Sequence, residues 1–115
     1  MLNLYGIPNC DTMKKARTWL VEQQLDFQFH DYKKVGIDTA TLQTWVDQVG
    51  WEILVNRRGP TWRKLPEADR ENLNEVLAIS LMQANPSLIK RPVLNTGSQL
   101  LVGFSPTEWQ QQLIK

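Results

Sequence analysis

The sequence has few of the residues that bind metals or form cross-links, with 1 cysteine and 1 histidine in 115 residues. A single cysteine cannot form an internal disulfide, and no Cys/His cluster with zinc-ligand spacing is present. A chain of this length can still bury enough apolar surface to fold without either aid. We therefore predict a single domain over residues 1–115 with no metal site and no bound cofactor.

An excess of charge of one sign and long apolar runs are also missing. The 13 basic and 12 acidic side chains leave a formal charge of +1, so no electrostatic footprint for nucleic acid is visible. No window approaches the roughly 20 apolar residues that cross a bilayer, and the N-terminus lacks the features of a signal peptide. We expect a cytoplasmic monomer without a nucleic-acid or membrane partner, in a compartment that keeps the thiol reduced.

The one cysteine, Cys10, lies between a short apolar strand and a helix. Residues 1–5 alternate like a strand, Gly6–Asn9 is a breaker run, and helical sequence follows to Gln24. The N-terminus of a helix has unpaired N–H groups and about half a positive elementary charge, which together favour a thiolate. The position predicts a nucleophile with a lowered thiol pKa. The alternative is a buried cysteine that acts as a small apolar residue.

The rest of the chain continues to alternate between strands and helices. We predict strands over 25–32, 90–95 and 99–102, the last two forming a hairpin, and helices over 38–50 and 67–85 and from Ser105 onward. In the 67–85 helix the predicted inner face includes Leu73, Val76 and Leu77. The order is β-α-β, then a helical insert over about 38–86, then β-β-α, which predicts a thioredoxin-like α/β fold.

Three motifs in this order carry a family resemblance. They are Gly6-Ile-Pro-Asn-Cys10 before a helix, Arg58 before Thr61-Trp-Arg-Lys-Leu65, and Lys90-Arg-Pro-Val-Leu94. Together they resemble the ArsC family of glutathione-linked arsenate reductases, most closely its YffB branch, which is related to the regulator Spx. The resemblance extends over essentially the whole chain, including the helical insert.

The resemblance implies a role for each matched residue. Cys10 corresponds to the family's nucleophile, and Asn9, Arg58, Arg91 and Pro92 correspond to the substrate-binding positions. Pro92 matches the proline that thioredoxin-like folds hold in cis facing the cysteine, beside backbone that can pair with an extended thiol peptide such as glutathione. The guanidinium groups would lower the thiol pKa and bind a carboxylate or an oxyanion. Arg57 is the alternative to Arg58, and a solvated loop is the alternative role for both.

Two departures from the family pattern bear on the reaction. Arsenate reductases have a third arginine shortly before the last helix, where this chain has Gly103 and Phe104, so we expect weak binding of arsenate. Spx-type proteins can have a second cysteine three residues after the first, where this chain has Met13. A mechanism that uses one thiol must therefore rely on an external thiol, and glutathione is the expected co-substrate.

These features predict a glutathione-dependent thiol reductase that acts on a small thiol or disulfide substrate. Two alternatives stay open: an Spx-like regulator that binds a protein partner without catalysis, and a true arsenate reductase. His30 has no paired acid in the sequence, so a surface or edge role is expected for it. The five tryptophans are expected to pack in the fold, although Trp62 could line a ligand groove.

Overall fold

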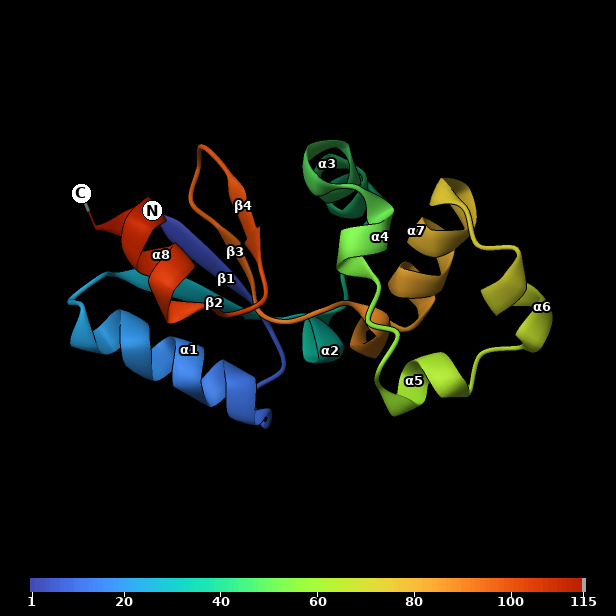
Figure 1. The fold of residues 1–115 in the computed structure, drawn as a ribbon, viewed down its shortest axis with the longest axis horizontal. Coiled ribbons are helices and arrows are strands. Elements are labelled where there is room, and N and C mark those ends of the chain that lie inside the picture. Colours follow the sequence, from blue (N-terminus) through green and yellow to red (C-terminus); the bar gives the residue numbers. More distant parts are fainter. Residues whose placement is uncertain (115) are drawn as a thin grey trace. The chain divides into compact units, whose positions relative to one another are not determined.

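The computed structural model describes residues 1–114, which divide into two units (Figure 1). One unit contains residues 1–31 and the chain from Arg91 onward, and the other contains Tyr32–Lys90. The helical insert predicted over about 38–86 falls within the second unit, whereas the single domain over residues 1–115 stays a prediction. Within residues 1–114 no helix is long and apolar enough to span a membrane.

The first unit is built on a four-stranded sheet with the order β2-β1-β3-β4. β1 (Leu2–Gly6) pairs in parallel with β2 (Phe27–Asp31) and antiparallel with β3 (Val93–Asn95), and β3 pairs antiparallel with β4 (Leu100–Val102). The parallel pair needs a long crossover, which the first helix provides. The predicted thioredoxin-like α/β fold is confirmed.

Helices α1 (Asp11–Glu22) and α8 (Pro106–Leu113) contribute to one apolar core with the sheet. The buried members of this core are Leu4, Met13, Ala16, Leu20, Leu94, Leu101 and Trp109. The three from α1 are spaced by three and four residues, which places them on one face of the helix. This packing holds α1 against the sheet and thereby fixes the position of its N-terminus.

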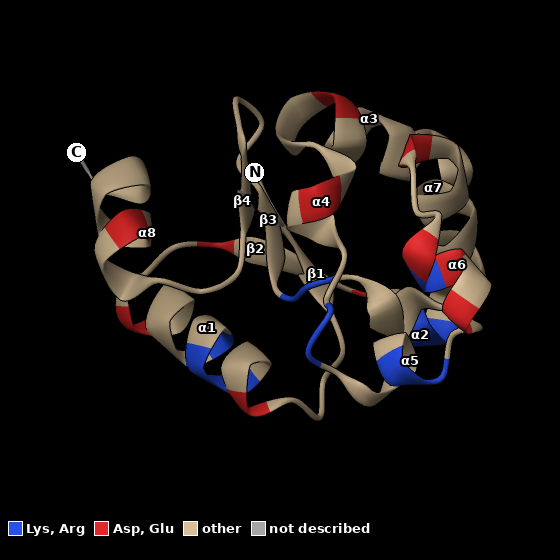
Figure 2. Cartoon of the chain, turned by 45° about the vertical axis from the view of Figure 1, so that its right-hand side comes forward, with Lys and Arg blue, Asp and Glu red and all other residues tan. Residues whose placement is uncertain are grey.

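The second unit is helical. It contains α2 (Tyr32–Val35), α3 (Thr39–Val49), α4 (Trp51–Leu54), α5 (Pro60–Arg63), α6 (Glu67–Glu71), α7 (Glu75–Ala84) and the 3₁₀ helix η1 (Pro86–Leu88). An antiparallel bridge joins Val55 to Ile89, with hydrogen bonds from Asn56 N–H to the Leu88 carbonyl (2.8 Å) and from Lys90 N–H to the Leu54 carbonyl (2.7 Å). The bridge anchors the start of the segment between α4 and α5, residues 55–59. The two arginines of this segment, Arg57 and Arg58, give it its blue colour in Figure 2.

The prediction of one helix over 67–85 is wrong. The chain forms α6 and α7 instead, because the side chain of Asn74 accepts a hydrogen bond from Leu77 N–H (2.9 Å) and caps a new helix. The predicted inner face is wrong as well: Val76 is 80% exposed, whereas Ala78 and Met82 are fully buried. Apolar residues occur on most sides of α7, so the sequence did not determine which side faces inward.

Candidate active site around Cys10

Cys10 is the N-cap residue of α1, as its position in the sequence predicts. Its backbone is extended, with φ −121° and ψ 132°, and its carbonyl accepts the N–H of Lys14 at 3.0 Å. The side chain is half-buried and the thiol is free. Because the turn from β1 into α1 places the sulfur at the helix N-terminus, the first N–H groups of the helix are available to stabilise a negative charge there.

The surroundings of Cys10 favour its ionised form. Burial raises the pKa of the thiol and is the largest single influence on it. The backbone N–H groups of Met13 and Thr12 and the guanidinium of Arg91 act in the opposite direction and together outweigh burial, so the pKa lies below its usual value. A larger fraction of the thiol is therefore a thiolate near neutral pH, which is the form that attacks disulfides.

Arg91 and Pro92 approach the cysteine from the segment that leads into β3. The peptide bond between them is cis, as predicted. The Arg91 guanidinium is a hydrogen-bond donor to the Cys10 sulfur and also stabilises it through its charge. Pro92 is buried, and its carbonyl accepts the N–H of Gly103 at 2.8 Å. The first unit thus brings the predicted nucleophile and one of the predicted arginines together.

The segment where arsenate reductases have a third arginine is apolar in this protein. Gly103 has a positive φ of 81° and bonds to Pro92. The ring of Phe104 packs edge-on against Trp109, with centroids 4.8 Å apart, and against Trp19, with centroids 6.3 Å apart. Within the first unit, no cation from this segment adds to the charge of Arg91.

Arg17 supports the loop that carries the cysteine, a role that the sequence analysis missed. Its guanidinium donates to the carbonyl of Pro8 at 3.1 Å and lies over the ring of Phe29, 5.1 Å from the centroid. The spacing of seven positions places Arg17 on the same face of α1 as Cys10, but it does not indicate the bond to Pro8. Arg17 therefore connects the turn before Cys10 to the sheet.

Gly6 and Met13 form a tight contact beneath the loop. Met13 occupies the position where Spx-type proteins can have a second cysteine, and its side chain is fully buried. A Cβ at position 6 would overlap the Met13 sulfur and its terminal methyl group. The end of β1 can therefore come this close to α1 only because Gly6 has no side chain.

This contact gives a prediction about stability. Gly6→Ala should lower the free energy of unfolding by about 1–3 kcal/mol, because the end of the buried Met13 side chain would have to shift within a close-packed core. Urea denaturation measures the change. In a Met13→Ala background the same substitution should cost much less, since the obstructing atoms are gone. An equal cost in both backgrounds would show that the overlap is not the cause.

The two arginines of the second unit differ in their surroundings. The Arg57 guanidinium lies over the ring of Trp62, 5.3 Å from its centroid. Arg58 is held through its backbone: its N–H donates to the Asn56 side chain at 3.1 Å, and its carbonyl accepts from Arg63 at 3.0 Å. The Arg58 guanidinium has no partner within residues 1–114. That Arg58 acts together with Cys10 stays a prediction.

Asn9 and His30 complete the residues considered from sequence. Asn9 is exposed beside Cys10, and its side chain has no partner among the described residues, so its role in binding stays a prediction. His30 stacks on Tyr5, with centroids 4.5 Å apart, and its Nε2 lies 2.8 Å from the Asn3 side-chain oxygen, which indicates a structural role. In residues 1–114 no three or more His, Cys, Asp or Glu residues are grouped to hold a metal ion.

Comparison with known proteins supports the same assignment of fold and family. The structure of a YffB protein is 53% identical, with a TM-score of 0.95, covering 98% of this chain and 99% of that one. The structure of an arsenate reductase (ArsC) related protein from Brucella melitensis is 49% identical, with a TM-score of 0.79 and coverage of 99% and 95%. The global transcriptional regulator Spx of Streptococcus pyogenes is 31% identical over 94% of this chain and 81% of the regulator.

The resemblance inferred from the three motifs is thereby confirmed. The model of the ArsC family matches residues 5–112, a span that contains Cys10, Arg58, Arg91 and Pro92. The cysteine is thus at the N-terminus of α1, with the Arg91–Pro92 segment beside it, in a chain matched over nearly its whole length. The chain belongs to the ArsC family.

Proposed function

We propose that the protein is a glutathione-dependent thiol reductase in which Cys10 is the only nucleophile. The observation that supports this most strongly is the pairing of Cys10 with Arg91 at the N-terminus of α1, which lowers the thiol pKa. A docking protein has no need of an acidic thiol. Membership of a family with arsenate reductase-related members agrees with a reductase.

The reaction consists of two exchange steps. In the first, the Cys10 thiolate attacks the glutathionyl sulfur of a mixed disulfide; a new S–S bond forms, the old one breaks, and the substrate leaves as a thiolate that takes a proton from water. In the second, the thiolate of a second glutathione attacks the glutathionyl sulfur on Cys10, which yields oxidised glutathione and restores the Cys10 thiolate. Substrate is reduced and glutathione is oxidised, so the electrons balance.

The number of arginines at the proposed site favours glutathione over arsenate as the ligand. Glutathione has two carboxylates, for which Arg91 and Arg58 are the proposed partners. Arsenate is a small anion that is best held by several converging cations, and this chain has Gly103 and Phe104 where a third arginine would be. A charge-assisted contact contributes about 1.5–3 kcal/mol, so its loss weakens arsenate binding roughly tenfold or more.

A direct comparison of two substrates tests this proposal. We expect glutathione-coupled turnover of a small mixed disulfide to be at least about tenfold faster than turnover of arsenate. Arg58→Ala should weaken the binding of glutathione, with Arg57→Ala as the matched control, because Arg57 already lies over Trp62. An arsenate rate equal to or above the disulfide rate would contradict the proposal and favour an arsenate reductase.

The second candidate is a binding protein like Spx. The identity of 31% to the Spx regulator of Streptococcus pyogenes, over most of this chain, supports this candidate. Because this chain has only one cysteine, such a regulator would work without an internal disulfide switch. If the folded protein turns over neither substrate, this second candidate replaces the reductase.

The monomeric state and the absence of a bound cofactor are also proposals. Light scattering measures the first, and the mass of the native protein measures the second.

A further inference from the structure

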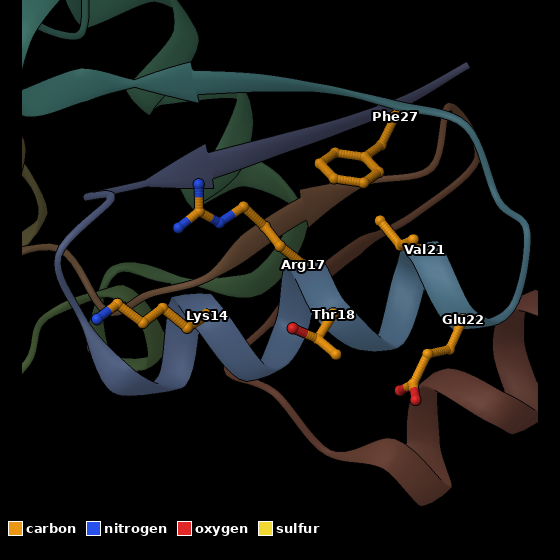
Figure 3. Close-up of a pocket in the computed structure, with 6 residues that line it drawn as sticks. All are labelled: Lys14, Arg17, Thr18, Val21, Glu22 and Phe27. Carbon is orange, nitrogen blue, oxygen red and sulfur yellow. The ribbon is translucent and has the colours of Figure 1, made fainter.

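A groove on the first unit extends away from Cys10 along α1. It has a volume of about 430 Å³ and is lined by Lys14, Arg17, Thr18, Val21 and Glu22 of α1 and by Phe27 of β2. Figure 3 shows Lys14 at the end of α1 that follows Cys10, Glu22 at the opposite end, and Val21 and Phe27 facing each other between them. A second hollow of about 310 Å³ continues beyond Val21 and Phe27.

The charged groups at the two ends of the groove are available to a ligand. Neither the Lys14 ammonium nor the Glu22 carboxylate has a partner within residues 1–114. Val21 is 66% exposed, although it is a large apolar residue. The groove therefore presents a cation near Cys10 and, towards its far end, an apolar pair of Val21 and Phe27 beside the Glu22 anion. No part of the proposed exchange chemistry accounts for this arrangement.

The length of the groove exceeds what glutathione can fill. At 1.5 Å per helical residue, Lys14 lies about 6 Å and Glu22 about 18 Å along the axis from Cys10. An extended chain spans about 3.3 Å per residue, so these distances correspond to about two and about five residues. Glutathione has only one residue on each side of its cysteine, and it cannot extend to Val21 or Glu22.

We infer that this groove binds an extended polypeptide, so that the substrates of the enzyme are proteins or peptides that carry a disulfide. This inference rests on the proposed function. About two residues from the reacting cysteine the substrate would have an acidic residue facing Lys14. About five residues from it the substrate would have an apolar residue between Val21 and Phe27, followed by a basic residue facing Glu22. Cys10 attacks the substrate sulfur; a Cys10–substrate S–S bond forms, the old S–S bond breaks, and the old partner leaves as a thiolate that takes a proton from water. A glutathione thiolate then attacks the substrate sulfur, which releases the Cys10 thiolate and leaves a substrate–glutathione mixed disulfide, and the two steps of the proposed function reduce that disulfide.

Peptide probes with a chromophoric leaving group test this inference. Each probe has its cysteine at one end as a mixed disulfide with thionitrobenzoate, followed by glutamate, leucine and lysine at the spacings given above. A second probe has the glutamate and lysine exchanged, and both chain directions are made. We expect the first probe to release thionitrobenzoate about fivefold faster at low salt, a difference that salt reduces.

Matched variants assign the effect to the groove. Lys14→Glu should remove or reverse the preference, whereas Lys15→Glu, which makes the same charge change on an exposed neighbour outside the groove, should keep it. Val21→Ser should slow both probes and leave iodoacetamide alkylation unchanged. Equal rates for the two probes, or equal behaviour of the two lysine variants, would overturn the inference while the proposed function stands. Failure of every disulfide to react with the folded protein would overturn both.

Discussion

Replacing Cys10 by serine should abolish thiol–disulfide exchange and leave the fold intact. The serine hydroxyl is a much weaker nucleophile than a thiolate, and the chain has no other cysteine to replace it. Serine is a favoured N-cap residue, and Cys10 is only half-buried, so the free energy of unfolding should change by less than about 1 kcal/mol. Glutathione-coupled activity and urea denaturation measure the two effects separately.

The two measurements also distinguish the alternative role of Cys10. A structural cysteine would give a variant that unfolds at lower urea concentration, with activity lost only in proportion to unfolded protein. Activity retained in a folded Cys10→Ser protein would remove the cysteine from the mechanism altogether.

Replacing Arg91 by alanine should slow the reaction of Cys10 near neutral pH by about tenfold. Arg91 stabilises the thiolate through a hydrogen bond and through its charge, and one charge-assisted bond of about 1.5–3 kcal/mol corresponds to roughly this factor or more. The pKa of the thiol should move up, because burial, which raises it, is then opposed only by the N–H groups of Met13 and Thr12. The rate of iodoacetamide alkylation against pH reports the shift.

A neighbouring lysine provides the control for Arg91. Lys90→Ala removes the same charge one residue earlier, where the side chain is exposed and only the backbone is bonded, so it should change the alkylation profile little. At a pH well above both thiol pKa values, wild type and Arg91→Ala should react at similar rates, because the thiol is then fully ionised in each. An Arg91→Ala profile that matches wild type at every pH would contradict the role assigned to this arginine.

Most of the first unit could be predicted from its sequence because local signals there agree with one another. Strand alternation, the breaker run before Cys10 and the Ser105 cap each indicated the element that forms; Ser105 accepts the N–H of Glu108 at 3.2 Å. The second unit was harder. The Asn74 cap begins α7 partway through a continuous helical pattern, and the apolar residues of α7 do not define one face.

The site was predicted only in part, for reasons of distance along the chain. Cys10 is recognisable from its own neighbours, whereas Arg91 follows it by 81 positions, and its contact with the sulfur depends on how the strands pair. Arg17 was missed because its bond to Pro8 requires the loop to fold back over α1. The groove along α1 was invisible, since Phe27 joins it only through the pairing of β2 with β1.

The most direct test of the central claim is the intact mass of the protein after exposure to oxidised glutathione at neutral pH. We predict that the mass rises by one glutathionyl group, that this group is on Cys10, and that an excess of reduced glutathione removes it. Arg91→Ala should form the adduct more slowly, and Cys10→Ser should not form it. A folded wild-type protein whose mass stays unchanged would contradict the account.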